Sequence, residues 1–345
     1  MKFGAALPTC VEGMVYPLPF AGPHEILDVA RQAEDLGYHS VLANDHFSTQ
    51  AYVRNTHSVP PNYYDPLMIL SACALVTQRI QLMTGVVVLP IRDPAVLAKQ
   101  AATLDHLSRG RVAIGVGVGA YREEFEAMRP QWRGVRRSQL MDEGLACLIA
   151  LFSQRDATVA GSYYGLDHVE MYPKPVQLPL PIYSCGNAPA TIERAARHCQ
   201  GWMPAGLGAD RLRAGVATLT ALAEEAGRDP DSISVAPQLV VCLGQTEAAA
   251  GATFEASGVY KHLISLRRAT LRHIDLDAYR VVNLIGTPAD VCDRIGTYQA
   301  AGADHLPGLI FVANSLTELQ EQMSWFARDV IAQFPTPGQL QRAEG

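Results

Sequence analysis

Residues 80–119 decide the fold, and they read IQLMTGVVVLPIRDPAVLAKQAATLDHLSRGRVAIGVGVG. Residues 80–89 form a nearly continuous apolar run, which is typical of a strand buried on both faces. Residues 94–107 start with a proline and have the composition of a helix. Residues 111–119 are again mostly apolar, with glycine at every second position from Gly115 to Gly119. A strand, a helix and another strand in this order predict a βαβ unit of a parallel sheet.

The same alternation extends along the chain in both directions. Strands are predicted at residues 3–8, 40–44, 80–89, 111–119, 181–186, 202–205, 233–243 and 305–312. Helices are predicted at residues 23–37, 65–76, 94–107, 137–152, 190–198, 210–226, 288–301 and 316–334, with a further helical region from residue 247. Eight βα units in 345 residues match a (β/α)8 TIM barrel, so we predict this α/β fold. A doubly wound sheet of about five to seven strands is the alternative.

One domain over residues 1–345 follows from this regular alternation, although length alone allows two or three domains of about 150 residues. Three segments exceed an ordinary connection of about two to six residues. They follow strand 2 (46–64), precede strand 5 (154–179) and follow strand 7 (250–286). Segments that follow strands lie at the functional face of a barrel, so 46–64 and 250–286 are predicted to wall a pocket, with 250–286 as a lid. Tolerated surface insertions are the alternative.

Composition and charge exclude several classes of protein. Hydrophobic residues make up 48% and charged residues 18%, which indicates a large buried core. The formal net charge is −6 and no basic stripe occurs, so no nucleic-acid partner is expected. No apolar run approaches about 18 residues, so no membrane partner is expected either. The seven cysteines are scattered and contain no C-x-x-C pair, which predicts reduced thiols in a cytoplasmic protein.

Glycine alternates along the strand predicted at residues 111–119. Gly115, Gly117 and Gly119 share one face of it, which is therefore bare of side chains. Because glycine weakens a strand by about 0.5–1 kcal/mol, this pattern predicts the close approach of a planar ligand or of another backbone. With Ala120 the glycines also fit the dinucleotide pattern G-x-G-x-x-[GA]. The acidic residues at the distance this pattern requires fall in a predicted helix, which speaks against a dinucleotide site.

A second motif joins the strand at 181–186 to the following helix. It reads Cys185-Gly186-Asn187-Ala188-Pro189. Free backbone N–H groups and the positive end of the helix dipole suit the binding of a phosphate at such a place. An ordinary strand-to-helix turn is the alternative.

A third motif, Asn44-Asp45-His46-Phe47, ends the strand at 40–44. It puts an Asp–His pair at the functional rim of a barrel, where the pair could transfer protons, orient a substrate or bind a metal. A metal would need more ligands, and the other histidines lack metal-ligand spacing, so no metal site is predicted. We predict His46 and Asp45 to be catalytic or to contact a cofactor, with a capped loop histidine as the alternative.

Taken together, these segments resemble the bacterial luciferase-like flavin monooxygenase family. The resemblance runs through nearly the whole chain. Its matches are Lys2-Phe3-Gly4, Ala33-Glu34-Asp35-Leu36-Gly37-Tyr38, Asn44-Asp45-His46-Phe47, Arg79-Ile80, Thr84-Gly85-Val86, Leu89-Pro90, Asp93-Pro94, Ala98 to Asp105, Ser108-Arg109-Gly110-Arg111, Tyr121 to Phe125, Pro173 to Gln177, Gly286-Thr287-Pro288 and Ala301 to His305.

The resemblance implies a barrel that binds reduced FMN or the deazaflavin coenzyme F-420 at its carboxyl end. It also implies a non-proline cis peptide at the end of strand 3, where this chain has Gly85-Val86. The implied catalytic residues are His46 and Asp45. The cofactor-binding residues are predicted to be Thr84, Gly85, Val86, Gly117, Gly119, Tyr121, Cys185, Gly186 and Asn187.

The activity implied by the resemblance is that of a two-component monooxygenase. A separate flavin reductase would supply reduced flavin, and O₂ would oxygenate a small, mostly apolar substrate. The alternatives are hydride transfer with F-420, a flavin-binding protein without turnover, and a metal-dependent barrel hydrolase. Ala120 stands where sugar-phosphate dehydrogenases of the family have a catalytic Glu, and Asp45 where two-component luciferases have a His, so the cofactor stays open. A homodimer or tetramer is also implied.

Overall fold

The computed structural model describes residues 1–266 and 278–334. Within these ranges, ten strands form one sheet in the order β11-β10-β12-β1-β2-β3-β4-β7-β8-β9, and its neighbouring strands are parallel. The strands are β1 (Lys2–Ala6), β2 (Ser40–Ala43), β3 (Gln81–Val88), β4 (Val112–Gly117), β7 (Ile182–Cys185), β8 (Gly201–Met203), β9 (Ser234–Val235), β10 (Val240–Leu243), β11 (Leu284–Gly286) and β12 (His305–Phe311).

Segment 234–243 makes the sheet curl. At its start β9 pairs with β8, and at its end β10 pairs with β12, so both sides of the sheet meet in one short stretch of chain. Pro237 lies between β9 and β10 and has no N–H to donate, which explains why the strand predicted at 233–243 is divided. All eight strands predicted from the sequence belong to this sheet.

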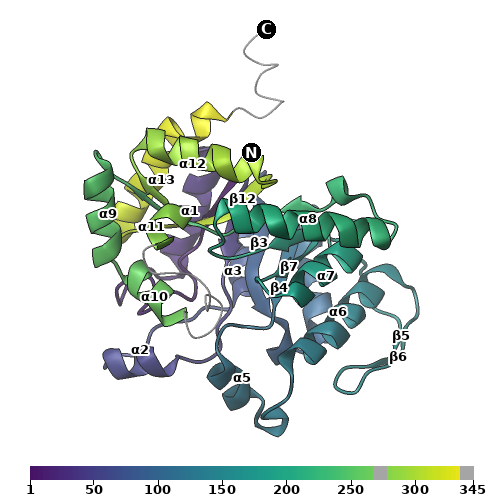
Figure 1. Cartoon of the computed structure of the whole chain (residues 1–345). Helices are drawn as coiled ribbons and strands as arrows, with labels where there is room; N and C mark the ends of the chain where they lie inside the picture. The colour runs from purple at the N-terminus through teal and green to yellow at the C-terminus, as the bar shows by residue number, and fades with distance from the viewer. Residues whose placement is uncertain (267–277, 335–345) are drawn as a thin grey trace.

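Helices surround the strands, as Figure 1 shows. They are α1 (Pro23–Asp35), α2 (Ala51–Thr56), α3 (Pro66–Val76), α4 (Pro94–Ser108), α5 (Arg122–Met128), α6 (Arg137–Ser153), α7 (Pro189–His198), α8 (Ala209–Glu225), α9 (Glu247–Ala256), α10 (Gly258–Leu266), α11 (Ala278–Val282), α12 (Pro288–Ala300) and α13 (Leu316–Asp329). Four 3₁₀ turns are described at Leu89–Ile91, Pro130–Trp132, Pro230–Ser232 and Ile331–Gln333. The first helices after β2 and β4, namely α2 and α5, lie in the lower part of the view, and α10, which follows α9, lies above α2 at the left.

Apolar side chains fill both faces of the curled sheet. The larger cluster lies between the strands and the helices, which explains why the strands are apolar at consecutive positions. A smaller cluster draws one or two residues from each of several strands around the curl: Leu42, Met83, Ala113, Tyr183, Cys185, Met203 and Ala236, with Val86 against it. The inside of the sheet is therefore packed, and a ligand site is expected at its edge.

The three long segments contain structure that the sequence periodicity misses. Segment 46–64 includes α2, and segment 154–179 includes an antiparallel hairpin of β5 (Ala157–Val159) and β6 (Leu166–Val169). Segment 250–286 includes most of α9 and all of α10, α11 and β11. Part of this predicted lid, residues 267–277, lies outside the described residues.

Two searches of the described residues complete the picture. None of the helices in them is long and apolar enough to cross a membrane. Across residues 1–266 and 278–334, no group of three or more His, Cys, Asp or Glu side chains is arranged to hold a metal ion.

Candidate active site

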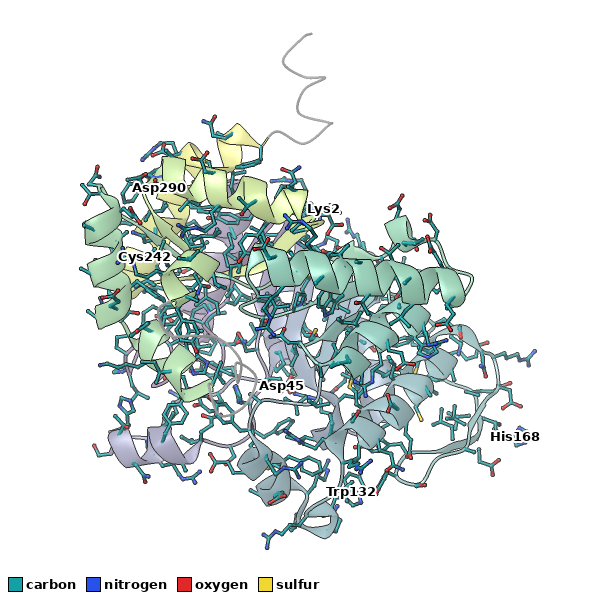
Figure 2. All side chains as sticks on the ribbon, viewed as in Figure 1. Lys2, Asp45, Trp132, His168, Cys242 and Asp290 are labelled. Atoms are coloured by element: carbon teal, nitrogen blue, oxygen red, sulfur yellow. The ribbon has the colours of Figure 1, made fainter. Side chains whose placement is uncertain are left out.

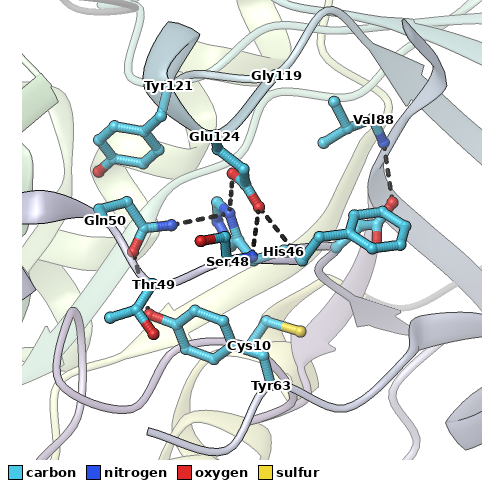
Figure 3. Close-up of polar contacts among 12 residues, drawn as sticks. Cys10, His46, Ser48, Thr49, Gln50, Tyr63, Val88, Gly119, Tyr121 and Glu124 are labelled. Atoms are coloured by element: carbon cyan, nitrogen blue, oxygen red, sulfur yellow. Dashed lines mark hydrogen bonds and ion pairs between the residues drawn. The ribbon is translucent and has the colours of Figure 1, made fainter. Parts of the chain in front are cut away.

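His46 and Glu124 form the polar centre of the edge at which β2 and β4 end. His46 follows β2, and Glu124 lies in the first turn of α5, just after β4. His46 Nδ1 lies 2.9 Å from Glu124 Oε2, as the dashed lines of Figure 3 indicate. The side chains are 15% and 4% exposed, so the pair is largely shielded from water.

Glu124 also holds the backbone of the loop that carries His46. Its Oε1 accepts hydrogen bonds from the N–H groups of Phe47 at 2.6 Å and Ser48 at 3.2 Å. Burial alone would raise the pKa of Glu124, but the hydrogen bond and charge of His46 and the two backbone N–H groups outweigh it and lower the pKa. The carboxylate is therefore ionised at neutral pH.

Gln50 and Tyr63 continue this network from the same ring nitrogen of His46. Gln50 Nε2 lies 3.0 Å from His46 Nδ1, and the Tyr63 hydroxyl donates to Gln50 Oε1 at 3.1 Å. The rings of Tyr63 and Tyr121 lie 5.8 and 6.0 Å from that of His46, measured between centroids. His46 is thus enclosed by aromatic rings as well as by polar groups.

Asp45 is directed away from this network and toward Arg92. Its Oδ2 accepts from Arg92 Nε at 2.8 Å and its Oδ1 from Arg92 Nη2 at 2.7 Å. The N–H of Val88 donates to Oδ2 as well, at 3.1 Å (Figure 3). The labelled Asp45 lies deep among the side chains in Figure 2, and its side chain is 2% exposed. Of the predicted Asp–His pair, only His46 is therefore free of a fixed cationic partner.

The peptide bond between Gly85 and Val86 is cis, as the family resemblance implies. Two side-chain amides donate to the carbonyl oxygen of Gly85: Asn44 Nδ2 at 2.9 Å and Gln238 Nε2 at 3.5 Å. Thr84, also predicted to bind cofactor, is fully buried and donates its hydroxyl to Gly115 O at 2.9 Å. It therefore links β3 to β4 and does not present a polar atom at the edge.

The alternating glycines have different neighbours. A Cβ on Gly115 would lie 2.2 Å from the carbonyl oxygen of Thr84, so this glycine is required by another backbone. A Cβ on Gly117 would meet the side chain of Val86 at 3.1 Å and Cys185 O at 3.5 Å, beside the cis peptide. Gly119 has φ +78°, which an L side chain rarely adopts. A Cβ on Gly119 would also lie 2.8 Å from the side chain of Val88, so at all three glycines the absent side chain leaves room for a neighbouring strand.

Tyr121 connects the end of β4 with α2 and α10. Its hydroxyl lies 3.4 Å from that of Tyr52 and 3.5 Å from Ser265 Oγ. The Tyr52 hydroxyl lies 3.0 Å from His262 Nδ1. Burial, with a smaller contribution from the charge of His46, lowers the pKa of His262 to about 4, so this imidazole is neutral at pH 7. Segments that follow three different strands therefore meet above the site.

The predicted phosphate motif lies at the end of β7 and the start of α7. Gly186 has φ +124°, and its N–H donates to Met203 O at 3.0 Å. Asn187 uses its side chain on Ala205, with Nδ2 donating to the carbonyl oxygen at 2.8 Å and Oδ1 accepting from the N–H at 3.0 Å. Ala188, the N-cap of α7, makes no side-chain cap hydrogen bond. Cys185 belongs to the smaller apolar cluster inside the curled sheet, and burial raises the pKa of its thiol well above the ordinary value.

Sequence reasoning missed the partners that organise the site. Glu124, Gln50, Arg92 and Gln238 bind predicted residues but lie up to 153 positions away from them in the chain. The one available signal was the match Tyr121 to Phe125, which contains Glu124. It carries no information on which of its two adjacent glutamates reaches His46.

Comparison with known proteins places the similar sequences in one enzyme family. Residues 1–305 match the model of the luciferase-like monooxygenase family. The FMNH₂-dependent dimethylsulfone monooxygenase of Pseudomonas putida is 24% identical over 334 residues, which cover 88% of this chain and 85% of that protein. The F420-dependent glucose-6-phosphate dehydrogenase of Amycolatopsis mediterranei is 30% identical over 184 residues, 53% of each chain. Relatives therefore use reduced FMN or F420.

A solved structure extends the likeness to the fold. The monooxygenase RslO1 from Streptomyces bottropensis superimposes with a TM-score of 0.80, covering 97% of this chain and 100% of its own, at 24% identity. At this identity the likeness concerns the arrangement of strands and helices.

Proposed function

The chain belongs to the luciferase-like monooxygenase family, and from this premise we propose that it is a two-component flavin-dependent monooxygenase. In this proposal a separate reductase supplies reduced FMN, and O₂ oxygenates a small, mostly apolar substrate. The dimethylsulfone monooxygenase supports it, because that likeness extends over 88% of this chain and 85% of the relative. The single observation that carries the proposal is His46, a shielded histidine at the edge where the glycine-containing end of β4 and the cis peptide of β3 meet.

In the proposal a planar ring lies against the end of β4 and the cis peptide of β3. Gly117 lets the side chain of Val86 and the carbonyl oxygen of Cys185 approach the strand, because a Cβ there would lie 3.1 and 3.5 Å from them. In the proposal Gly85, Val86, Gly117, Gly119 and Tyr121 contact the ring, while Thr84 and Cys185 shape the strands behind it. When bound, the flavin supplies the electrons and the reaction with oxygen, which no side chain of this chain can supply.

The phosphate end of the cofactor is assigned to the start of α7. Pro189 has no N–H, and the N–H of Thr191 donates to Ala188 O at 2.8 Å, so in the proposal the N–H of Ala190 and the positive dipole end of the helix are left for the anion. Gly186 and Asn187 would shape this turn, Asn187 through its two hydrogen bonds to Ala205. The net charge of −6 is compatible with this assignment, because the binding groups are backbone amides.

His46 is proposed to hold or move a proton at the reacting atoms. Its side chain is partly exposed, and a ring nitrogen within hydrogen-bond reach of a substrate is what general acid–base catalysis requires. Asp45 is proposed to act through position: bound to Arg92, it fixes the start of the loop that carries His46. Catalysis by direct proton transfer is thus assigned to His46 alone.

Several coarser features complete the proposal. The curled sheet is interpreted as a closed (β/α)8 barrel that forms one domain over residues 1–345. Its insertions are the segments 46–64, 154–179 and 250–286, which were predicted after strand 2, before strand 5 and after strand 7 of the barrel. The segment 250–286 is proposed to cover the substrate, and the protein is proposed to act as a homodimer or tetramer.

A deazaflavin-dependent hydride transfer is the second candidate, favoured by the 30% identity to the glucose-6-phosphate dehydrogenase.

Titration of the protein with reduced FMN and with F420, followed by fluorescence under anaerobic conditions, tests the proposal. We expect binding of FMN at about micromolar Kd, and oxygen uptake above the free-flavin rate with members of a panel of small apolar substrates. Tight binding of F420 with reduction of an alcohol would replace the proposal by the hydride-transfer alternative. Binding without turnover would indicate a carrier, and binding of neither cofactor would overturn both enzymatic functions.

A further inference from the structure

We propose that Glu124 is a positioning residue, which fixes the ring proton of His46 on Nδ1 and leaves Nε2 as the nitrogen that meets the substrate or cofactor. The inference rests on the proposed function, because it concerns the same histidine. It adds a residue that was not among those predicted from the sequence.

The first step is the orientation of the Glu124 carboxylate. Its Oε1 is committed to two donors, the N–H groups of Phe47 and Ser48, at 2.6 and 3.2 Å. Its Oε2 lies 2.9 Å from His46 Nδ1. The two oxygens are therefore assigned, and a rotation of the carboxylate that released His46 would also break the contacts to the loop.

The second step is the location of the His46 proton. An ionised carboxylate only accepts hydrogen bonds, so a hydrogen bond at 2.9 Å requires the proton on Nδ1. The lowered pKa of Glu124 agrees with an ionised group. Two backbone N–H donors on the other oxygen stabilise the same state, because hydrogen bonds to a charged acceptor are stronger than those to a neutral one.

Gln50 could support the opposite tautomer and therefore decides the proposal. Its Nε2 lies 3.0 Å from His46 Nδ1, and an amide nitrogen can only donate there to a lone pair. Nδ1 cannot donate to Glu124 and accept from Gln50 at once. Rotating the amide by about 180° brings Oε1 toward Nδ1 and the NH₂ group toward the Tyr63 hydroxyl, which can also accept. The Glu124 carboxylate can only accept a hydrogen bond, whereas the Gln50 amide can face Nδ1 with either its oxygen or its NH₂ group. Glu124 therefore determines that the proton is on Nδ1.

The third step concerns the other ring nitrogen. In the described part of the chain, no protein hydrogen bond reaches Nε2 of His46. With the proton on Nδ1, Nε2 carries a lone pair and can accept a proton from a reacting molecule. A carboxylate behind the ring also stabilises the charged imidazolium that results, so Glu124 favours each step in which His46 takes up a proton.

The decisive measurement is ¹⁵N NMR of histidine-labelled protein without flavin, at about pH 9, where an ordinary histidine is neutral. His46 is assigned as the signal that disappears in His46→Gln. We expect a protonated-type Nδ1 and an unprotonated-type Nε2 in the wild-type protein. A proton on Nε2 in the wild-type protein overturns the proposal, without the need for any Glu124 variant.

Glu124→Gln tests the cause of this tautomer. The oxygen of the new amide must stay on the N–H groups of Phe47 and Ser48, so its NH₂ group faces Nδ1 and donates to it. We therefore expect the His46 proton to move to Nε2. The matched control is Glu123→Gln, because Glu123 also binds the loop, through the N–H of Ala51 at 2.8 Å, but does not contact His46. An unchanged tautomer in Glu124→Gln would overturn the proposal.

Kinetics of the flavin-loaded protein supply the second readout. In Glu124→Gln, kcat is expected to fall by about 10²–10⁴-fold, while flavin affinity changes by less than about threefold. Glu123→Gln should retain both. A shifted tautomer with wild-type kcat would remove Glu124 from the positioning role. If the protein binds no flavin at all, the proposed function fails, whereas the tautomer assignment is still decided by NMR.

Discussion

Arg92 joins two carboxylates beneath the site and is the most constrained charge in its surroundings. It makes two hydrogen bonds to Asp45 and one to Asp65, at 2.7–2.8 Å, and its guanidinium lies 4.7 Å from the centroid of the Phe47 ring. The side chains of Arg92 and Asp45 are only 10% and 2% exposed. Water can therefore not replace the arginine as the partner of Asp45.

Arg92→Met should destabilise the protein by about 3–5 kcal/mol, because it leaves the Asp45 carboxylate buried without its cation. Urea unfolding measures the loss. The double variant Arg92→Met with Asp45→Asn should recover part of it, since the unpaired charge is then gone. Arg31→Met is the control: its ion pair with Asp28 is about half exposed, so a change below about 1 kcal/mol is expected. An equally small effect at Arg92 would contradict the assigned structural role.

At the scale of elements, α10 is attached to the rest of the edge through tyrosine hydroxyls. Tyr52 of α2 contacts His262, and Tyr121 contacts Ser265, so these two polar side chains of α10 face the same pair of rings. Val259 is the buried apolar residue of this nine-residue helix. The Tyr279 hydroxyl also donates to Leu263 O at 3.1 Å, and the Tyr260 ring packs edge-on against those of Phe254 and Tyr279, so α10 is held on two sides.

Tyr52→Phe should accelerate amide hydrogen exchange in residues 258–266 about fivefold, which corresponds to the loss of one hydrogen bond of about 1 kcal/mol. Exchange in α4 should stay unchanged. Tyr63→Phe is the matched control, because it removes a neighbouring hydroxyl that contacts Gln50 and not α10. Equal exchange in the wild-type protein and Tyr52→Phe would show that this hydrogen bond does not hold the helix.

Elements with a clear period were predictable from the sequence, whereas several of the short ones were not. The eight main strands follow from apolar runs between turn residues, and the helices from their apolar faces. β11 has three residues and α5 has seven, too few for a period to emerge. A similar limit applies to the site. His46 and the cis peptide between Gly85 and Val86 could be inferred from the family resemblance. Glu124 lies 78 positions from His46 in the chain, and only the folded structure brings the two side chains together.

At the scale of the whole molecule, β2 and β12 are joined by hydrogen bonds that cross β1, the strand between them. Ser40 of β2 donates to Pro307 O of β12 at 2.8 Å, and His305 Nε2 lies 2.9 Å from the same hydroxyl. β1 runs between these two strands, and a Cβ on its Gly4 would lie 2.0 Å from both Ser40 Oγ and Pro307 O. Gly4 therefore permits the second and last strands of the sheet to bond across the first.

His305 makes this contact sensitive to acid. The single proton of the Ser40 hydroxyl points to Pro307 O, so His305 Nε2 must donate to Ser40, and further protonation would charge a ring that is 1% exposed. Burial, and after it the charges of His39 and Lys2, lowers the pKa of His305 well below its ordinary value. Below pH of about 6.5 the unfolded chain binds a proton that the folded chain does not. Stability is therefore complete above this pH and falls below it, by about 1.4 kcal/mol per pH unit.

His305→Gln should remove this part of the acid sensitivity, because glutamine can still donate to Ser40 but does not titrate. Between pH 7.5 and 5.0 we expect the wild-type free energy of unfolding to fall by about 2 kcal/mol more than that of His305→Gln. Urea unfolding at several pH values gives the comparison. His24→Gln, at the exposed start of α1, should follow the wild-type curve. Parallel curves for wild type and His305→Gln would mean that His305 takes up its proton at the same pH in the folded and the unfolded chain, and that the bond across β1 does not require a neutral ring.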